Sequence, residues 1–492
     1  MSKRLIIILA LVFVAAFTMA AYAEVQNVKV SGDLTIKGVS RENIDLNKTR
    51  REETTASTDI TETNNDEQDN FLSIARVKID ADLTDNVSTT IRLINERDWD
   101  GDNAAAANND IDIDLAYVSM KEFLYSPLSL TLGRQELIYG NGLVVGDPDT
   151  NNLSGATSLT QDDLSLRKAF DSVKAVLNYD PLVVDLVYSK IDENTITGNG
   201  ANDDTDLYGL NANYALNKET TLEGYVFSKN TGSSAAEFTA AQRTRAAALT
   251  VNPNDHDLVN TFGVRISNSS IKNLKAQLEF AWQSGTYHPG FDINSLDNSE
   301  VGNRSAKAIQ ATLNYDLKDL PYLSKYISKY NPYLTGTYTY LSCAGNRRTT
   351  GSYHGWDPMF EDQTFGHLAN RIFRATNMQI LYLSGKATPV EDLTLTLDYA
   401  NYWLNERFPI ESTNVTTIGY GTTNFRNVAG AATYRMGDNK NLGQELDATL
   451  SYDYTEDVQF SLLGGVFLPG SAFHTINDSS AGEIIGSMKV TF

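Results

Sequence analysis

The sequence predicts an all-β fold, a transmembrane antiparallel β-barrel of about eighteen strands. Three observations lead to this prediction: a secretory signal at the N-terminus, a two-residue alternation of apolar and polar side chains through the rest of the chain, and an aromatic C-terminal residue, Phe492. The 492 residues show no break in composition that would divide them into separate domains. One large closed sheet therefore fits the sequence better than several small domains.

Residues 1–23 have the features of a secretory signal peptide. Lys3 and Arg4 precede the apolar run LIIILALVFVAAF, and Ala21-Tyr22-Ala23 supplies the small side chains that signal peptidase accepts. We expect cleavage after Ala23, which leaves residues 24–492 as the mature barrel. No later segment offers the roughly 20 consecutive apolar residues of a membrane-spanning helix. A membrane location therefore requires a closed barrel, in which every backbone group is hydrogen-bonded.

The C-terminal segment shows the alternation most clearly. In the strand that follows Leu442, apolar Leu446 and Leu450 alternate with polar Asp447 and Ser451. An aromatic residue at the end of the last strand is typical of the aromatic rim of an outer-membrane barrel. We expect this strand to pair with the first one, VQNVKVSGDLTIKGV, and so to close the barrel.

Alternation and turn chemistry together predict the number of strands, which is even, as in single-chain bacterial barrels. The strands start near residues 25, 70, 86, 110, 127, 168, 181, 206, 219, 257, 273, 303, 330, 376, 391, 441, 456 and 482. Short turns, such as Tyr179-Asp180-Pro181, alternate with long polar loops, the pattern of periplasmic turns and extracellular loops. The strands near 206, 219 and 376 are the least regular, and a barrel of sixteen strands is the alternative. Residues 427–437 are a candidate for an extra short strand inside a loop.

The longest predicted loops either fold into the lumen or close over its mouth. They are residues 41–69, 138–167, 342–375 and 404–440. On the opposite side of the membrane, residues 318–330 form the one long turn, in which Leu320, Leu323 and Ile327 at helical spacing indicate a short amphipathic helix. The single cysteine, Cys343, lies at the start of a loop and is interpreted as a free structural thiol.

Charged side chains fall on the inward positions of the strands, because Lys or Arg that faces lipid costs about 2–4 kcal/mol at the membrane midplane. The inward charged residues predicted by alternation are Arg76, Lys78, Asp80, Asp82, Arg92, Glu96, Asp112, Asp114, Lys174, Arg265, Lys275, Glu279 and Asp398. Basic and acidic groups are mixed, with Arg76 near Asp80 and Arg92 near Glu96. We expect these residues to line a pore.

The formal net charge of the chain is −22. Removal of Lys3 and Arg4 with the signal leaves 38 basic against 62 acidic residues, a net charge of −24. A chain of this charge is not expected to bind nucleic acid. Much of the acid lies in predicted loops such as residues 62–69, and exposed charges beyond a screening length of about 8 Å hardly influence one another. The net charge therefore does not decide the selectivity of the pore.

Five segments along the chain resemble the alginate export family of outer-membrane proteins. They are LGRQELIYGNGLVVGD at residues 132–147, RKAFDSVKAVLNYD, PYLTGTYTYLSCAGN, GWDPMF and LGQELDATLSYDYTEDVQFSLLGGVFLPG. The resemblance covers most of residues 70–492. It implies a barrel of about eighteen strands whose arginine-rich constriction passes an anionic polysaccharide.

Two basic residues stand at motif positions of the family that this chain resembles. Arg134 matches the family's motif arginine. Alternation with Leu132 points its side chain at lipid, so we expect a β-bulge at Gly133 that turns it inward. Without a bulge, the side chain must snorkel to the membrane surface. Lys168 stands where the family usually has an arginine before x-Phe-Asp, with Arg167 beside it. The lysine keeps the charge but loses bidentate carboxylate binding, which weakens the case for alginate itself.

Other chemistries have weaker support in the sequence. Asp98, Asp100 and Asp102, and likewise Asp147, Asp149 and Asn151, have the spacing of the first three calcium-loop ligands, but neither set has Glu at position twelve. Acidic turns of this kind are usually solvated, so calcium binding stays open. The five histidines are too widely spread for a metal cluster, and no cofactor is expected. No residue spacing indicates the catalytic set that an enzyme would need.

The sequence thus predicts an outer-membrane channel for anionic solutes, and export of an alginate-like or other uronate polysaccharide is the leading hypothesis. The candidate pore-lining residues are Arg76, Lys78, Arg92, Arg134, Lys168, Lys174, Arg265, Asp80, Asp112 and Asp114. The alternatives are a porin for other small solutes and a purely structural or adhesive barrel. The expected partners are outer-membrane lipid, the anionic oligosaccharide or polysaccharide and, for export, periplasmic export machinery.

Overall fold

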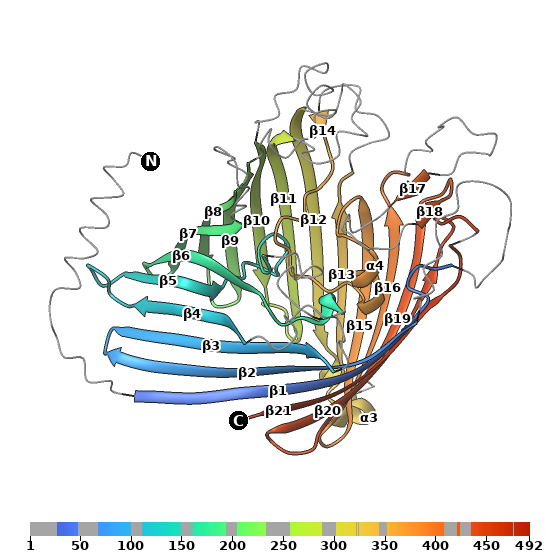
Figure 1. The fold of residues 1–492 in the computed structure, drawn as a ribbon, viewed down its shortest axis with the longest axis horizontal. Coiled ribbons are helices and arrows are strands. Elements are labelled where there is room, and N and C mark those ends of the chain that lie inside the picture. Colours follow the sequence, from blue (N-terminus) through green and yellow to red (C-terminus); the bar gives the residue numbers. More distant parts are fainter. Residues whose placement is uncertain are drawn as a thin grey trace.

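The computed structural model describes residues 27–47, 67–99, 111–148, 159, 161–192, 204–232, 256–287, 302–320, 322, 324–343, 352–407, 421–423, 434–475 and 477–492. The predicted signal peptide, residues 1–23, lies outside them, as do Asp100, Asp102, Asp149 and Asn151. The main sheet of this part has 19 strands. One of these is β14 (Ser352–Tyr353), a two-residue strand that joins the sheet beside β12 (Gly302–Asp316). The other eighteen form a closed antiparallel barrel (Figure 1).

The strands of the barrel wall follow one another around the barrel in chain order (Figure 1). They are β1 (Asn27–Glu42), β2 (Gln68–Thr84), β3 (Val87–Asp98), β4 (Asp112–Met120), β5 (Leu128–Glu136), β6 (Ala169–Asn178), β7 (Leu182–Asp192), β8 (Thr205–Ala215), β9 (Thr220–Thr231), β10 (Asp257–Asn268), β11 (Leu274–Tyr287), β12, β13 (Tyr333–Leu341), β15 (Met378–Val390), β16 (Leu393–Leu404), β19 (Asn441–Asp453), β20 (Val458–Pro469) and β21 (Ala481–Thr491). Every predicted strand is present, including the three least regular ones. The sixteen-strand alternative is wrong.

Strand β1 closes the barrel by pairing with β21, from Asp33 opposite Thr491 to Glu42 opposite Gly482. Phe492 extends this pairing: its N–H donates to the Gly32 carbonyl at 3.0 Å, and its own carbonyl accepts from the Gly32 N–H at 2.8 Å. A Cβ on Gly32 would come within 2.7 Å of the Phe492 ring. The predicted pairing of the first and last strands is confirmed, and Figure 1 shows β1 beside β21.

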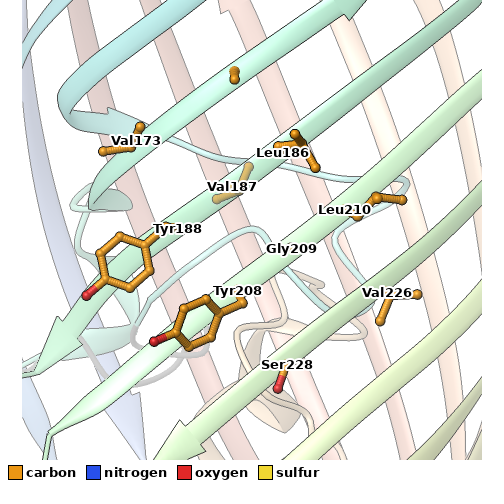
Figure 2. A pocket seen from close by; sticks show the side chains of 10 residues that line it. Val173, Leu186, Val187, Tyr188, Tyr208, Gly209, Leu210, Val226 and Ser228 are labelled. Carbon is orange, nitrogen blue, oxygen red and sulfur yellow. The ribbon is translucent and has the colours of Figure 1, made fainter. Parts of the chain in front are cut away.

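The outer wall of the barrel is apolar. Leu278, Phe280 and Trp282 of β11 are exposed, as the alternation predicts for lipid-facing positions. An apolar groove also lies on this wall between Tyr188 of β7 and Tyr208 of β8, whose ring centroids are 5.2 Å apart (Figure 2). Most of its lining consists of outward-facing side chains, so the groove faces the membrane and not the lumen.

Several short elements lie outside the barrel wall. The long turn between β12 and β13 contains η3 (Leu317–Asp319), α3 (Ser324–Ile327) and η4 (Ser328–Tyr330). The expected amphipathic helix is thus three short helical turns, and α3 has no buried residue. Strand β18 (Tyr434–Met436) pairs with β17 (Gly421–Thr423), which confirms a short strand within residues 427–437. Among the described residues, every helix is too short or too polar to span a lipid bilayer.

Candidate pore constriction

Two long loops, parts of residues 138–167 and 342–375, fold into the lumen, which is the first of the two alternatives that the sequence left open for them. In the first, the Tyr139 ring packs on Phe227 of β9, with 5.0 Å between centroids. In the second, Met359 Sδ accepts a hydrogen bond of 2.9 Å from Thr261 Oγ1 of β10. One buried apolar cluster joins both loops to inward side chains of the wall. Because these wall positions face inward, the loops lie inside the barrel.

Backbone hydrogen bonds join the two luminal loops to each other. Val145 and Phe360 form an isolated parallel bridge, and the Gly146 N–H donates to the Phe360 carbonyl at 2.7 Å. The Asp362 N–H donates to the Gly142 carbonyl at 2.8 Å. Gly142 has a φ of +74°, and a Cβ there would come within 2.8 Å of the Asp362 carbonyl oxygen. The glycines of the segment GNGLVVGD therefore permit this close approach of the two loops.

A third segment, residues 161–167, is fixed to the opposite part of the wall by Arg41. The fully buried guanidinium of Arg41 in β1 donates to Glu483 of β21 at 3.0 Å, to Gln161 at 2.6 Å and to Asp163 at 2.8 Å. Apolar side chains of this segment pack on inward residues of β1, β2 and β3. The inner wall on this side is thus covered as well, which narrows the lumen.

Arg167 continues the network of the third segment. Its Nε donates to Glu96 of β3 at 3.1 Å, and its Nη2 donates to Asp112 of β4 at 2.7 Å. Glu96 also accepts from the Ser165 hydroxyl and the Leu166 N–H. Side-chain alternation predicts Glu96 and Asp112 as pore residues, and Arg167 stands only beside a motif position. The structure shows that these three residues hold the segment in place.

Two further ion pairs connect the second luminal loop to the third segment and to Lys168, the residue that follows that segment. Lys168, which directly precedes β6, pairs with Asp362 of the second loop. Arg371, on α4 (His367–Ile372), pairs with Asp162 of the third segment. All four side chains are partly exposed, between 16% and 31%. We call these four residues the luminal latch. The motif position predicts Lys168 as a site residue, whereas no recognisable sequence pattern points to Arg371.

Helix α4 itself is held by the wall. The N–H groups of Leu368 and Ala369 donate to the buried Glu445 carboxylate of β19 at 2.7 and 2.8 Å. These are free donors of the first helical turn, and the two carboxyl oxygens of Glu445 satisfy them. Glu445 thereby fixes the helix that carries Arg371.

The other predicted pore-lining residues form ion pairs on the inner wall. These are Arg76 with Asp33 at 2.9 Å, Lys78 with Asp80 at 2.9 Å, Arg92 with Asp114, Lys174 with Asp185 at 3.1 Å, and Arg265 with Glu223 at 2.7 Å. Arg92 also pairs with the exposed Glu136, the last residue of β5. The expected proximity of Arg76 to Asp80 and of Arg92 to Glu96 does not produce ion pairs. Alternation predicts the face on which a charge lies, but strand register selects its partner.

Arg134 does not reach the inner wall as expected. Gly133 and Arg134 pair with β4 and β6 without a register shift, so the bulge predicted at Gly133 is wrong. A register shift does occur one strand away, between Arg92 and Leu93, where β3 pairs with β4. Arg134 therefore stays on the outward row with Leu132, where it donates to Asp171 at 2.9 Å. Asp171 is 60% exposed, and Arg134 must snorkel along the outer surface.

Gly133 serves a different purpose from the one that the sequence suggested. Its φ is +121°, and a Cβ would lie 2.1 Å from the Ala116 carbonyl oxygen of the neighbouring strand. Only glycine adopts this conformation inside an unbroken strand at low cost. The motif glycine is thus explained by backbone conformation and not by a bulge.

Burial shifts the pKa values of two carboxyl groups in the second luminal loop. Burial alone would raise the pKa of Asp357, but Lys229 at 2.8 Å and Arg304 outweigh it and hold that pKa well below its usual range. Burial raises the pKa of Glu361 to about 8, since only the Gln363 N–H donates a hydrogen bond to its carboxylate. The loop therefore contains one firmly ionised acid and one that titrates near neutral pH.

No metal centre is evident in the described part of the chain, where no three His, Cys, Asp or Glu side chains are placed to hold an ion. Of the two candidate calcium turns, only Asp98 and Asp147 belong to this part. Asp98 accepts a hydrogen bond of 3.0 Å from Asn70. Cys343, the single cysteine of the chain, is not part of a disulfide bond.

Comparisons with known proteins agree with this architecture. The family model described as alginate export matches residues 41–487. No curated protein sequence matches the chain. Among solved structures, Pseudomonas aeruginosa OpdO is similar with a TM-score of 0.52 and 11% identity, over 96% of this chain and 98% of that one. Acinetobacter baumannii OccAB2 is similar with a TM-score of 0.51 and 10% identity, over 96% and 99%. At such low identity these two structures support the fold alone.

Proposed function

Because the chain belongs to the alginate export family and forms an outer-membrane channel, we propose that this channel passes an anionic polysaccharide that carries carboxylates, such as a uronate polymer. That the protein is an outer-membrane channel follows from its family and from its closed barrel. The identity and charge of the solute are the proposed part. The substitution of lysine for the family's arginine at residue 168 leaves the particular polymer open.

The observation that carries the proposal is the luminal latch. Lys168 and Arg371 each hold an aspartate carboxylate at the place where the luminal segments meet. A uronate presents the same chemical group on each sugar unit, so its carboxylates can replace those of Asp362 and Asp162 one at a time. The latch residues are partly exposed, so the exchange requires little further desolvation.

The paired charges of the wall support passage as well as binding. Most basic side chains on the wall have an acidic partner among the described residues, for example Arg76 with Asp33. A polyanion that moves along such a wall meets cations whose attraction is already partly neutralised, and it is not trapped at any of them. A channel needs sites that bind well enough to admit its solute and weakly enough to release it. The same balance of charge favours the alternative function, a porin for small solutes.

Measurements in a planar bilayer test the proposal. We expect a reversal potential in a salt gradient that indicates anion preference, and block by oligouronates at concentrations about tenfold below those of neutral oligosaccharides of equal length. Asp362→Asn, which removes the carboxylate that Lys168 binds, should strengthen the block. A cation-selective channel, or equal block by charged and neutral sugars, would contradict the anionic solute and leave the porin.

A further inference from the structure

Three neighbouring strands, β12, β13 and β15, carry uncharged polar side chains on their inward rows. The rows continue from Gln310, which hydrogen-bonds to Gln363 of the second luminal loop at 3.1 Å, so they face the lumen below that loop. Strand register aligns six hydroxyl or amide side chains there in two rows of three. We call these residues the neutral strip. They are Thr312, Thr337 and Tyr382 in one row, and Asn314, Thr335 and Ser384 in the other.

Hydrogen bonds within the neutral strip leave some of its donors unused. Thr312 Oγ1 and Thr337 Oγ1 are 3.1 Å apart, and in such a pair only one hydroxyl donates to the other. Thr335 Oγ1 donates to Asn314 Oδ1 at 2.9 Å, whereas the side-chain NH₂ of Asn314 donates to no described residue. All six side chains except Thr312 are partly exposed. The neutral strip can therefore donate hydrogen bonds to a ligand in the lumen and accept them from it.

Charged groups border the neutral strip but do not interrupt it. The inward charged residues next to it are Lys275, Glu279, Asp316, Lys386 and Asp398. Asp398 accepts a hydrogen bond of 2.8 Å from the Tyr382 hydroxyl, and Asp316 pairs with Lys318 of the adjacent turn at 2.7 Å. Both signs of charge are present at the border. A ligand on the neutral strip is therefore bound mainly by hydrogen bonds.

The neutral strip and the ion pairs of the wall lie on opposite sides of the lumen. β4 is the fourth and β13 the thirteenth of the eighteen wall strands, so these two strands face each other across the barrel. Arg92 of β3 and Asp114 of β4 form one of the ion pairs on the charged side. A uronate unit has a carboxylate on one edge of its ring and hydroxyl groups on another. Its two edges thus match the two sides of the lumen.

We propose that the neutral strip binds the ring hydroxyl groups of the glycan, so that the channel selects a sugar polymer and not negative charge alone. This inference rests on the proposed function and adds the residues that recognise the sugar. Hydroxyl and amide groups can both donate and accept, as sugar hydroxyl groups do. A hydrogen bond between neutral groups contributes little net free energy, because it replaces bonds to water. The glycan is therefore recognised without being trapped.

The test compares two double variants, each of which loses one hydrogen-bonded pair of hydroxyl groups from the inner wall without any change of charge. The strip variant is Thr312→Val with Thr337→Val. The control variant is Ser119→Ala with Thr131→Val, whose hydroxyl groups are also 3.1 Å apart, on β4 and β5. Replacing both members of a pair leaves no unpaired donor in either variant. The conductance in symmetric salt verifies that both variants are folded and inserted.

Three blockers of equal length are applied to each variant and to the wild type in a planar bilayer. They are an oligouronate, a neutral oligosaccharide and an oligoglutamate, which carries carboxylates but no sugar hydroxyl groups. We expect the strip variant to require about tenfold more of either sugar for block than the control variant does, because one hydrogen bond between neutral groups changes affinity by roughly two- to tenfold. Block by oligoglutamate should be the same in both variants.

The outcomes separate the neutral strip from the proposed function. Strip and control variants that respond alike to the sugars, or a strip variant in which block by oligoglutamate weakens as much as block by the oligouronate, would overturn the neutral strip while the proposed function stands. The same holds for a wild-type channel that oligoglutamate blocks as strongly as the oligouronate does. A wild-type channel that the oligouronate does not block would overturn both.

Discussion

Gly133 is a single residue on which the strand pairing of β5 depends. We predict that Gly133→Ala lowers the free energy of unfolding by about 1–3 kcal/mol, because the φ of +121° is strained for alanine and the new Cβ would meet the Ala116 carbonyl at 2.1 Å. Gly224→Ala is the matched control, since a Cβ at Gly224 of β9 has no neighbour within 4 Å. Urea unfolding of both variants in lipid vesicles measures the difference. Equal stabilities would show that Gly133 does not need its special conformation.

Arg41 is the residue that ties the third luminal segment to the closing strands. We predict that Arg41→Ala costs about 3–5 kcal/mol of folding free energy, because it leaves Glu483 buried without its partner. Arg407→Ala removes an exposed arginine, which pairs with Asp438, and should cost about 1 kcal/mol or less. Unfolding in urea compares the two variants. A loss at Arg41 as small as that at Arg407 would mean that the buried network is not required for stability.

At the scale of the element, the second luminal loop contains the buried acid Glu361. Its pKa of about 8 in the folded chain lies above the ordinary value of 4.5. Between these two values the unfolded chain releases the proton and the folded chain keeps it, so stability falls as pH rises. Asp362 and Asp147 disfavour the charged form further, whereas Arg374 favours it. The loop should therefore be held in the lumen more firmly in acid than in base.

We predict that Glu361→Gln removes this pH dependence. The variant should gain stability over the wild type as pH rises from about 5 to about 8, because glutamine has no proton to release. Unfolding in urea at several pH values measures the gain, and the channel conductance over the same range reports whether the loop leaves the lumen. Glu219→Gln, at an exposed turn, is the control and should follow the wild type. A Glu361→Gln variant with unchanged pH dependence would show that Glu361 does not titrate in this range.

The elements differ in how far the sequence predicted them. Strands were predictable because lipid outside and polar groups inside enforce a period of two, which Leu278 and Glu279 of β11 illustrate. The luminal loops were predictable only as long segments. Arg371 and Asp162 are 209 residues apart, and no local period indicates that they meet. Contacts of this kind depend on the path of irregular backbone, which side-chain alternation does not describe.

At the scale of the whole molecule, the sequence indicated which face of the wall is charged but not which charges cancel. The inward rows of Arg76 and Arg92 follow from alternation, whereas their pairing with Asp33 and Asp114 follows from the tilt and register of neighbouring strands. Arg134 shows the limit of motif reasoning. Its position matched a family motif, yet an unbroken register keeps it on the outer surface.

These placements predict how three arginines affect the selectivity of the channel. Arg76→Ala and Arg92→Ala each remove an inward cation and leave Asp33 or Asp114 unpaired, so each should move the reversal potential in a salt gradient toward cations. The shift in reversal potential is enlarged because the low-dielectric wall screens the charges of Asp33 and Asp114 poorly. Arg134→Ala should leave the reversal potential unchanged, because this side chain lies outside the lumen. It is the matched control, with the same change of residue and of net charge.

A double variant separates charge from structural damage in the selectivity experiment. Adding Asp33→Asn to Arg76→Ala removes both members of the pair, and the reversal potential should return toward the wild-type value because the local charge is again zero. A shift that persists in the double variant would mean that Arg76 acts through the shape of the pore. If Arg134→Ala moved the potential as far as Arg76→Ala, Arg134 would have to face the lumen, and the outward placement set by the register of β5 would be wrong. If neither Arg76→Ala nor Arg92→Ala had any effect, the ions would pass elsewhere in the barrel, away from the paired charges of β1 to β4.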